Sequence, residues 1–220
     1  MADIAHELRT PLSVIQGRLE GLLDGVYPRD DDRLRLVLEE TRVLARLIED
    51  IRTVANSESG TLTLEREPTD VAVLVTDIVR SLMPHADARG VGLATSCSTD
   101  LPLVDLDPLR VREVLTNVIV NAIRHTPVGG TVAIEATAEA NRLRLRVTDT
   151  GSGIAPDDLP RIFDRFYKAP DSPGSGLGLA IARALVTAHD GEIRADSTLG
   201  QGTTITATLP LAVDTDDRST

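Results

Sequence analysis

The segment His6-Glu7-Leu8-Arg9-Thr10-Pro11-Leu12 combines a nucleophilic nitrogen with an adjacent carboxylate. Glu7 can hold one ring nitrogen of His6, which fixes the tautomer and leaves the other nitrogen free to attack an electrophile such as phosphorus. Thr10 follows one helical turn later on the same face. Pro11 removes the amide that would bond the Glu7 carbonyl, so a bend is expected beside the histidine. The alternative is a surface helix with an incidental histidine and a tolerated proline.

A second candidate site is a polar stripe on a helix that Pro108 is expected to open and His125 to end. Residues at intervals of four form this stripe: Glu113, Asn117, Asn121 and His125. Asparagine is a mediocre helix former, so two asparagines in one stripe favour a face that meets a ligand or water. An exposed polar face without a ligand is the alternative.

Two glycine-rich segments complete the candidate chemistry. Asp149 ends a predicted strand and enters Gly151-x-Gly153, where missing β-carbons let a flat base approach while the carboxylate accepts its exocyclic N–H. A tight Asp-Gly turn is the alternative. The segment from Gly174 to Gly178, with glycine at every second position, precedes a helix whose N-terminal amides can face phosphate. It matches neither a Walker loop nor a dinucleotide motif, because no Gly-Lys-Ser/Thr follows it and no strand immediately precedes it.

Both phenylalanines and one of the two tyrosines fall within residues 163–167, between the two glycine segments. This clustering predicts a mobile lid under which Phe163 and Phe166 pack, with Gly and Pro residues at 170–176 allowing it to move. A small satellite core is the alternative interpretation.

A helical hairpin is expected to carry His6. Apolar residues recur at spacings of three or four in two runs, the first ending near Asp24 and the second reaching about residue 56. Gly25 and Tyr27-Pro28 separate them, and Asp30 to Asp32 supply N-cap candidates. The apolar seam predicts that two hairpins pair as a four-helix bundle, giving a homodimer through residues 1–58. Periodicity alone assigns no function to such a bundle.

After Ser57-Glu58-Ser59-Gly60 the pattern changes to mixed helix and strand. Helices are expected at about 70–86, 108–125 and 177–189, and strands near 131–138, 142–149, 192–196 and 203–209. A loop or a strand is expected near 91–97. This alternation predicts an α/β sandwich with helices on one face of a mixed sheet, and an α+β chain as a whole. The expected domains are residues 1–59 and 60–212, followed by a disordered acidic tail at 213–220.

Composition narrows the classes of partner. The chain has 220 residues, 41% of them hydrophobic, and a formal net charge of -11. Nucleic acid and anionic lipid both require clustered Lys and Arg, so we expect neither nucleic-acid binding nor membrane contact in this fragment. Cys97 is the only cysteine, which excludes an intrachain disulfide.

Taken together, the His6 segment, the Asn117 to His125 stripe and the two glycine segments resemble the catalytic core of bacterial two-component sensor histidine kinases. The motifs occur in the family order along nearly the whole chain. The resemblance implies a dimerisation and histidine phosphotransfer hairpin followed by an ATP-binding domain of the GHKL, or Bergerat, type. It also implies ATP and Mg²⁺ as cofactors, autophosphorylation, and transfer of the phosphoryl group to an aspartate of a response regulator receiver domain.

The same resemblance implies roles for individual residues. His6 matches the phosphoacceptor, Glu7 the residue that assists proton removal, and Thr10 the residue that orients water during dephosphorylation of the regulator. Asn117 matches the Mg²⁺ ligand, and Asp149 matches the residue that recognises adenine. The other matching nucleotide-binding positions are Asn121, Arg124, His125, Gly151, Gly153, Ile154, Phe166, Gly174, Gly176, Leu177, Gly178, Leu179, Thr203 and Thr204.

Glu113 occupies the place of a water-activating glutamate in related ATPases, so a GHKL-type ATPase without phosphoacceptor activity stays an alternative, as does a dimeric scaffold with a vestigial site. The family's first helix normally continues upstream of the position of Met1, so we expect a missing input domain. The expected location is cytoplasmic, with a parent protein that could be anchored in the bacterial inner membrane.

Overall fold

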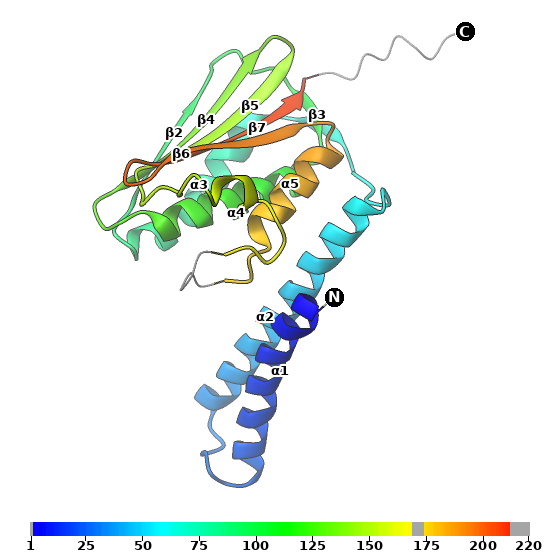
Figure 1. Ribbon diagram of the computed structural model, residues 1–220, viewed down its shortest axis with the longest axis vertical. Helices are drawn as coiled ribbons and strands as arrows, with labels where there is room; N and C mark the ends of the chain where they lie inside the picture. Colours follow the sequence, from blue (N-terminus) through cyan, green and yellow to red (C-terminus); the bar gives the residue numbers. More distant parts are fainter. Residues whose placement is uncertain (1, 169–173, 212–220) are drawn as a thin grey trace.

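The computed structural model describes residues 2–168 and 174–211, apart from the side chains of residues 2, 3 and 6. Two helices form the expected hairpin: α1 (Ala2–Leu23) and α2 (Asp31–Glu58). The hairpin extends away from the sheet domain (Figure 1). Helix α1 continues through Pro11, and the Asp30 side chain caps α2 by accepting the Arg33 amide at 2.8 Å.

The second part of the chain is built on a five-stranded mixed sheet in the order β2-β4-β5-β7-β6. The strands are β2 (Gly92–Cys97), β4 (Thr131–Glu139), β5 (Arg142–Asp149), β6 (Glu192–Thr198) and β7 (Gly202–Pro210). The pair β2-β4 is parallel and the other pairs are antiparallel. In register, Val147 lies between Ile134 and Ile205, and all three are buried. The predicted mixed sheet is confirmed.

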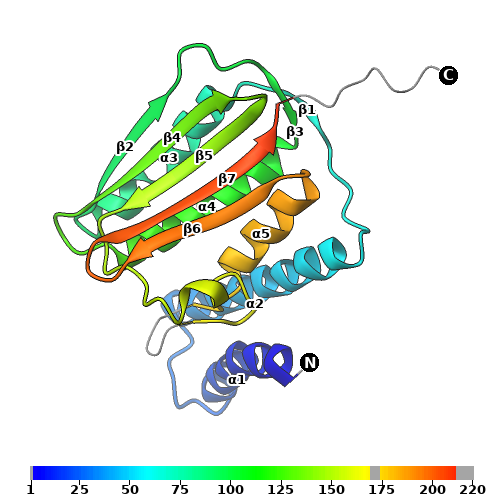
Figure 2. The same cartoon turned by 45° about the horizontal axis from the view of Figure 1, so that its top comes forward.

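Three helices cover one face of this sheet (Figures 1 and 2). They are α3 (Val71–Asp87), α4 (Pro108–His125) and α5 (Gly178–Ala188). Asp70 caps α3 by accepting the Val73 amide at 3.0 Å. The buried side of α4 is apolar, including Val111, Leu115 and Ile119, so its polar stripe points away from the core. The predicted sandwich with helices on one face is therefore confirmed.

Three short elements were not predicted: β1 (Glu67–Thr69), β3 (Val104–Leu106) and the 3₁₀ helix η1 (Leu159–Arg161). Strands β1 and β3 form a separate antiparallel pair. Three residues are too few to show a period of two or 3.6, so no sequence pattern could reveal these elements.

The hairpin packs directly on the sheet domain through α2 and α5. Leu47 and Val54 of α2 are 7% and 4% exposed and belong to the same hydrophobic core as the buried side of α5. Ser57 also donates its hydroxyl to the carbonyl of Ala184 at 3.1 Å. This contact brings the segment that contains His6 to the side of the second domain where residues 163–168 lie.

Among the described helices, none has both the length and the apolar character required to cross a membrane.

Candidate functional site

The polar face of α4 forms the floor of the candidate site. Asn117, Asn121, Arg124 and His125 are all half-buried. A β-carbon built on Gly178 would lie 3.6 Å from Oδ1 of Asn117, so the middle of α4 and the start of α5 are in contact. The fold therefore brings together the polar stripe and the second glycine segment, which are about 60 residues apart in the sequence.

Asp149 lies at the end of β5 beside the C-terminus of α4. Its carboxylate is 8% exposed, and Oδ1 accepts the amides of Gly151 at 2.8 Å and Thr203 at 3.2 Å. Burial raises the pKa of Asp149, while these two amides oppose the rise. The carboxylate is thus held in one orientation by the loop after β5 and by the start of β7.

His125 ends α4 next to this carboxylate. Burial is the main cause that lowers the pKa of His125, and the charge of Arg124 lowers it further. The imidazole is therefore neutral at neutral pH. The carbonyl of His125 accepts the amide of Ser152 at 3.2 Å, which ties the first glycine segment to the end of α4.

The first glycine segment is closely packed against other backbone. A β-carbon on Gly153, whose φ is +66°, would lie 2.1 Å from the carbonyl oxygen of Thr198. A β-carbon on Gly151 would lie 2.5 Å from the carbonyl oxygen of His125. Close approach of the protein's own backbone therefore requires glycine at both positions, in addition to any requirement from a bound base. The following residue, Ile154, donates its amide to the Ser197 hydroxyl at 2.8 Å.

The second glycine segment lies between α4 and the aromatic cluster. A β-carbon on Gly174 would lie 2.8 Å from Nη1 of Arg124. The carbonyl of Gly176 accepts the amide of Phe166 at 3.0 Å. Leu177 is buried, and no side chain caps the helix that starts at Gly178. The amides of Gly178 and its half-buried neighbour Leu179 thus form an anion-compatible helix start beside Asn117.

The aromatic residues lie at the base of the expected lid, each with its own contacts. Phe163 is 8% exposed and Phe166 packs against the main core. Tyr167 donates its hydroxyl to Asp158 at 2.5 Å, and the Arg161 guanidinium lies 4.8 Å from the Tyr167 ring centre. Residues 169–173, which the lid prediction includes, lie outside the described residues.

The two threonines of the last predicted segment lie on opposite faces of β7. Thr203 is 9% exposed and its hydroxyl contacts the Ser197 hydroxyl at 2.9 Å, on the side of Asp149. The Thr204 hydroxyl instead contacts that of Thr148 at 3.1 Å. A shallow hollow of about 220 Å³ lies at the ends of these strands, with Asp149 on its wall. It does not include the polar face of α4, so it forms only the edge of the candidate site.

The predicted nucleophilic segment lies on α1. Glu7 accepts a hydrogen bond from Nζ of Lys168 at 3.2 Å, Leu8 packs against the main core, and Thr10 is exposed. The side chain of His6 lies outside the described residues. The helix that carries His6 is therefore in contact with the segment between the two glycine segments.

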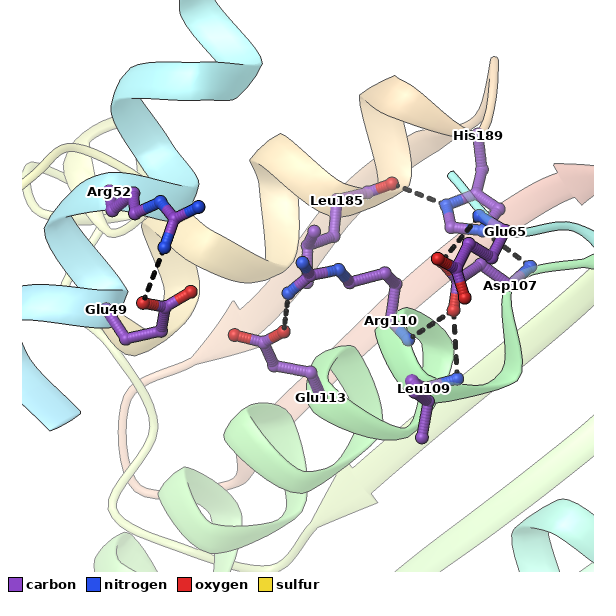
Figure 3. Close-up of polar contacts among 9 residues, drawn as sticks. All are labelled: Glu49, Arg52, Glu65, Asp107, Leu109, Arg110, Glu113, Leu185 and His189. Atoms are coloured by element: carbon purple, nitrogen blue, oxygen red, sulfur yellow. Dashed lines mark hydrogen bonds and ion pairs between the residues drawn. The ribbon is translucent and has the colours of Figure 1, made fainter. Parts of the chain in front are cut away.

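Glu113, the first residue of the polar stripe, is engaged by a charged neighbour that the sequence analysis did not single out. Arg110 donates to Glu113 at 3.0 Å, and both side chains are 29% exposed (Figure 3). Asp50 of α2 lies close enough to Glu113 for the two charges to interact. The pKa of Asp50 is raised to about 6, first by burial and then by the charge of Glu113. The ion pair between Arg110 and Glu113 could have been predicted from the sequence, because residues three apart on a helix are neighbours. No local pattern places Asp50 beside α4.

A buried polar hub holds the ends of α4 and α5 together (Figure 3). Oδ1 of Asp107 accepts the amides of Leu109 and Arg110, and Oδ2 accepts the amide of Glu65 at 3.0 Å. The Asp107 amide donates to Nε2 of His189 at 3.1 Å. Nδ1 of His189 lies 2.8 Å from the Leu185 carbonyl, so Nδ1 carries the proton of a neutral ring. Burial lowers the pKa of His189, in agreement with a neutral ring.

The side chains at this site suit a metal ion that takes only part of its ligands from the protein and the rest from phosphate. Within residues 2–168 and 174–211, no group of three His, Cys, Asp or Glu side chains could hold a metal ion. The Asn117 amide oxygen is a hard ligand of the kind that Mg²⁺ accepts, and Mg²⁺ usually completes its shell with substrate phosphates and water.

Two family models match the chain. Residues 1–60 match "His Kinase A (phospho-acceptor) domain", and residues 106–213 match "Histidine kinase-, DNA gyrase B-, and HSP90-like ATPase". The chain is 36% identical to sensor protein SrrB of Staphylococcus aureus over 219 residues, which are 96% of this chain and 37% of SrrB. It therefore spans well under half the length of the curated relatives it matches.

Solved structures agree with these matches. Acinetobacter baumannii histidine kinase AdeS superposes with a TM-score of 0.81 at 30% identity, over 94% of this chain and 98% of that one. Full-length ShkA in complex with AMPPNP superposes with a TM-score of 0.74 at 30% identity, over 96% of this chain and 45% of ShkA.

Proposed function

Because the chain belongs to the two-component sensor histidine kinases and contains their catalytic core, we propose that it phosphorylates its own His6 from ATP. The phosphoryl group then passes to an aspartate of a response regulator receiver domain. The observation that carries the proposal is the position of Asp149, whose Oδ1 is held by the Gly151 and Thr203 amides beside the polar face of α4.

The nucleotide is proposed to bind between α4, the two glycine segments and the end of β7. The amides of Gly151 and Thr203 both donate to Oδ1 of Asp149, so Oδ2 is the oxygen for the adenine amino group. The phosphates lie along the second glycine segment, where Arg124 and the N-terminal amides of α5 stabilise their charge. AMPPNP, which the related ShkA holds, is an ATP analogue and supports this choice of ligand.

Mg²⁺ is proposed to bind through Asn117, with phosphate oxygens and water as further ligands. When bound, the ion neutralises charge on the transferring phosphoryl group. Asn121 and His125 extend the same polar face toward Asp149. Thr203 contributes through its amide to Asp149, whereas the Thr204 side chain lies on the other face of β7.

The chemical step is an in-line displacement at the γ-phosphorus. A ring nitrogen of His6 forms the new P–N bond, and the bond from phosphorus to the β–γ bridging oxygen breaks, so that ADP leaves with the electron pair. Glu7 accepts the ring proton from the other nitrogen of His6. Positioning and charge neutralisation supply most of the rate acceleration in such transfers.

Arg110 gives a reason to prefer this step over ATP hydrolysis. A glutamate that activates water must be free to accept a proton, but Glu113 is ion-paired with Arg110 at 3.0 Å. The ion pair occupies the carboxylate that would have to accept the proton of water, so we propose that hydrolysis is slow relative to transfer.

Pairing of two hairpins into a homodimer is part of the proposal. Large apolar side chains along α1 and α2 are 41% to 71% exposed: Leu12, Leu19, Leu23, Leu34, Leu38, Val43 and Ile48. A second hairpin would bury them in a four-helix bundle. The regulator would dock on the bundle near Thr10, which we propose orients water for dephosphorylation of the regulator. A cytoplasmic site of action follows from this partner.

The direct test is incubation with γ-labelled ATP and Mg²⁺. Protein-bound label that is acid-labile and alkali-stable, present in the wild type and absent in His6→Gln, would establish the function. The control His85→Gln changes an exposed histidine on α3 and should label normally. Asn117→Ala should fold but fail to label, because it removes the proposed Mg²⁺ ligand. Release of phosphate without any protein-bound label would instead identify an ATPase.

A further inference from the structure

Lys168 is the only lysine of the sequence, although 23 residues are Lys or Arg. Its Nζ lies 3.2 Å from Oε1 of Glu7 on α1. The same ammonium donates to the carbonyl of Gly174 at 3.3 Å. Lys168 therefore contacts both the helix that carries the proposed phosphoacceptor and the first glycine of the proposed phosphate segment.

A second cation lies close to the same glycine. The β-carbon position of Gly174 is 2.8 Å from Nη1 of Arg124. Phosphate oxygens at Gly174 would thus lie within reach of two positive groups, one from α4 and one from Lys168. The two groups differ in kind, because a lysine ammonium is a point charge on a flexible stem, whereas a guanidinium is a planar fork.

The backbone before Lys168 is held by neighbouring elements. The Phe166 amide donates to Gly176 at 3.0 Å, the Tyr167 hydroxyl donates to Asp158, and Arg165 is ion-paired with Glu58. These contacts hold residues 165–167 in place, so the mobile part of Lys168 in the proposal below is its flexible side chain. The Lys168 and Glu7 side chains are 40% and 23% exposed, so there is solvent through which the ammonium can move.

We propose that Lys168 is a positioning residue that changes partner during the reaction, pairing with Glu7 before ATP binds and with the γ-phosphoryl group afterwards. This inference rests on the proposed kinase function. Departure of Lys168 frees Oε1 of Glu7 from its ion pair at the moment when the phosphoryl donor is in place, so that the carboxylate can accept the ring proton of His6. Lys168 makes and breaks only hydrogen bonds and ion pairs. The ring proton of His6 still goes to Glu7, and the electron pair of the broken P–O bond still leaves with ADP.

The single lysine permits a direct test by zero-length crosslinking. A carbodiimide joins a carboxylate to an amine with loss of water, so the ion pair should give a Glu7–Lys168 amide that mass spectrometry identifies. The protein is treated without nucleotide, with saturating Mg-ADP, and with saturating Mg-AMPPNP. We expect equal yields in the first two conditions. A yield about tenfold lower is expected with AMPPNP, which corresponds to a shift of about 1.4 kcal/mol in the pairing equilibrium.

Variants separate this role from a structural one. Lys168→Gln should lower kcat for His6 phosphorylation with a smaller change in KM for ATP, and Lys168→Arg should restore much of kcat because the charge returns. Arg183→Gln removes a nearby cation that pairs with Asp164 at 3.8 Å, and it should leave both crosslinking and kcat unchanged.

Three results would overturn the proposal: no crosslink in the nucleotide-free protein, equal crosslinking with ADP and AMPPNP, or an unchanged kcat in Lys168→Gln. Saturation by both nucleotides is verified by calorimetry. Failure of nucleotide binding would count against the ATP site itself, whereas equal yields at saturation would count only against the exchange.

Discussion

Replacing Asp50 with asparagine should stabilise the protein at neutral pH but not at pH 4. Asp50 lies on α2 where this helix faces α4, and its pKa is raised from 3.8 to about 6. Burial is the largest cause and the charge of Glu113 is the next, while Arg46 opposes them. Ionisation of Asp50 therefore works against the packing of the hairpin on the sheet domain, and asparagine imitates the protonated acid without that penalty.

The magnitude follows from linkage between protonation and folding. The difference between 3.8 and about 6, at about 1.4 kcal/mol per pH unit, corresponds to about 3 kcal/mol. Asp50 is only half-buried, so solvent screening reduces the expected effect to about 1 kcal/mol. Because the folded-state pKa is raised, protonation of Asp50 stabilises the folded protein. This stabilisation is complete below pH 3.8 and is lost as the pH rises through about 6. The advantage of Asp50→Asn should thus grow between pH 4 and 6 and be constant above pH 7.

Thermal melts of wild type and Asp50→Asn between pH 4 and 8 would measure this difference. A gain of about 1 kcal/mol corresponds to about 2–4 °C in Tm for a chain of this size. The matched control is Glu39→Gln, which removes an exposed acid from the same helix and should show no such window. A Tm difference that is the same at pH 4 and pH 8, or that the control reproduces, would refute the assignment of Asp50 to a desolvated site beside Glu113.

Three further predictions concern single residues. Gly153→Ala should lower Tm by several degrees and weaken ATP binding, because its β-carbon would lie 2.1 Å from the Thr198 carbonyl oxygen. The control Gly17→Ala has open space around the new β-carbon on α1 and should stabilise the protein by up to about 1 kcal/mol. Equal melting temperatures of the two variants would contradict this. Asp149→Asn should keep the fold but lose at least about tenfold in nucleotide affinity by calorimetry, because asparagine has one acceptor oxygen, whereas Asp149 uses Oδ1 for the two backbone amides and Oδ2 for adenine. Thr10→Ala should retain His6 phosphorylation but no longer dephosphorylate the regulator, and unchanged regulator turnover would remove Thr10 from the mechanism.

The helices with clear starts could be predicted almost to the residue. Asp70 and Asp107 both lie before an apolar stripe, and each accepts amides of the first turn of its helix. Local capping chemistry and periodicity are sufficient for such elements. The sheet also follows from alternating strands of eight or nine residues, because each presents one buried face.

The contacts between distant segments could not be predicted. The pairing of Lys168 with Glu7 joins residues 161 positions apart, and its lysine carries no periodic or capping signal. Nothing in the local sequence indicates that His189, which follows a helix, is buried or has a distant partner. Its Nε2 accepts the amide of Asp107, 82 positions away. The Thr203 and Thr204 pair shows the same limit, because only strand register decides which hydroxyl lies on the side of Asp149.

The hub around Asp107 determines how far the two parts of the chain can separate. It fixes the amide of Glu65 to the sheet domain, while α2 remains helical to Glu58. Only residues 59–64 connect these two fixed points, and six residues span about 20 Å when fully extended. A tether of this length keeps the domains at an effective concentration of the order of millimolar even when α5 leaves α2. The encounter between the nucleotide domain and the hairpin is therefore independent of protein concentration, so dilution should slow the proposed phosphorylation only through loss of the proposed dimer.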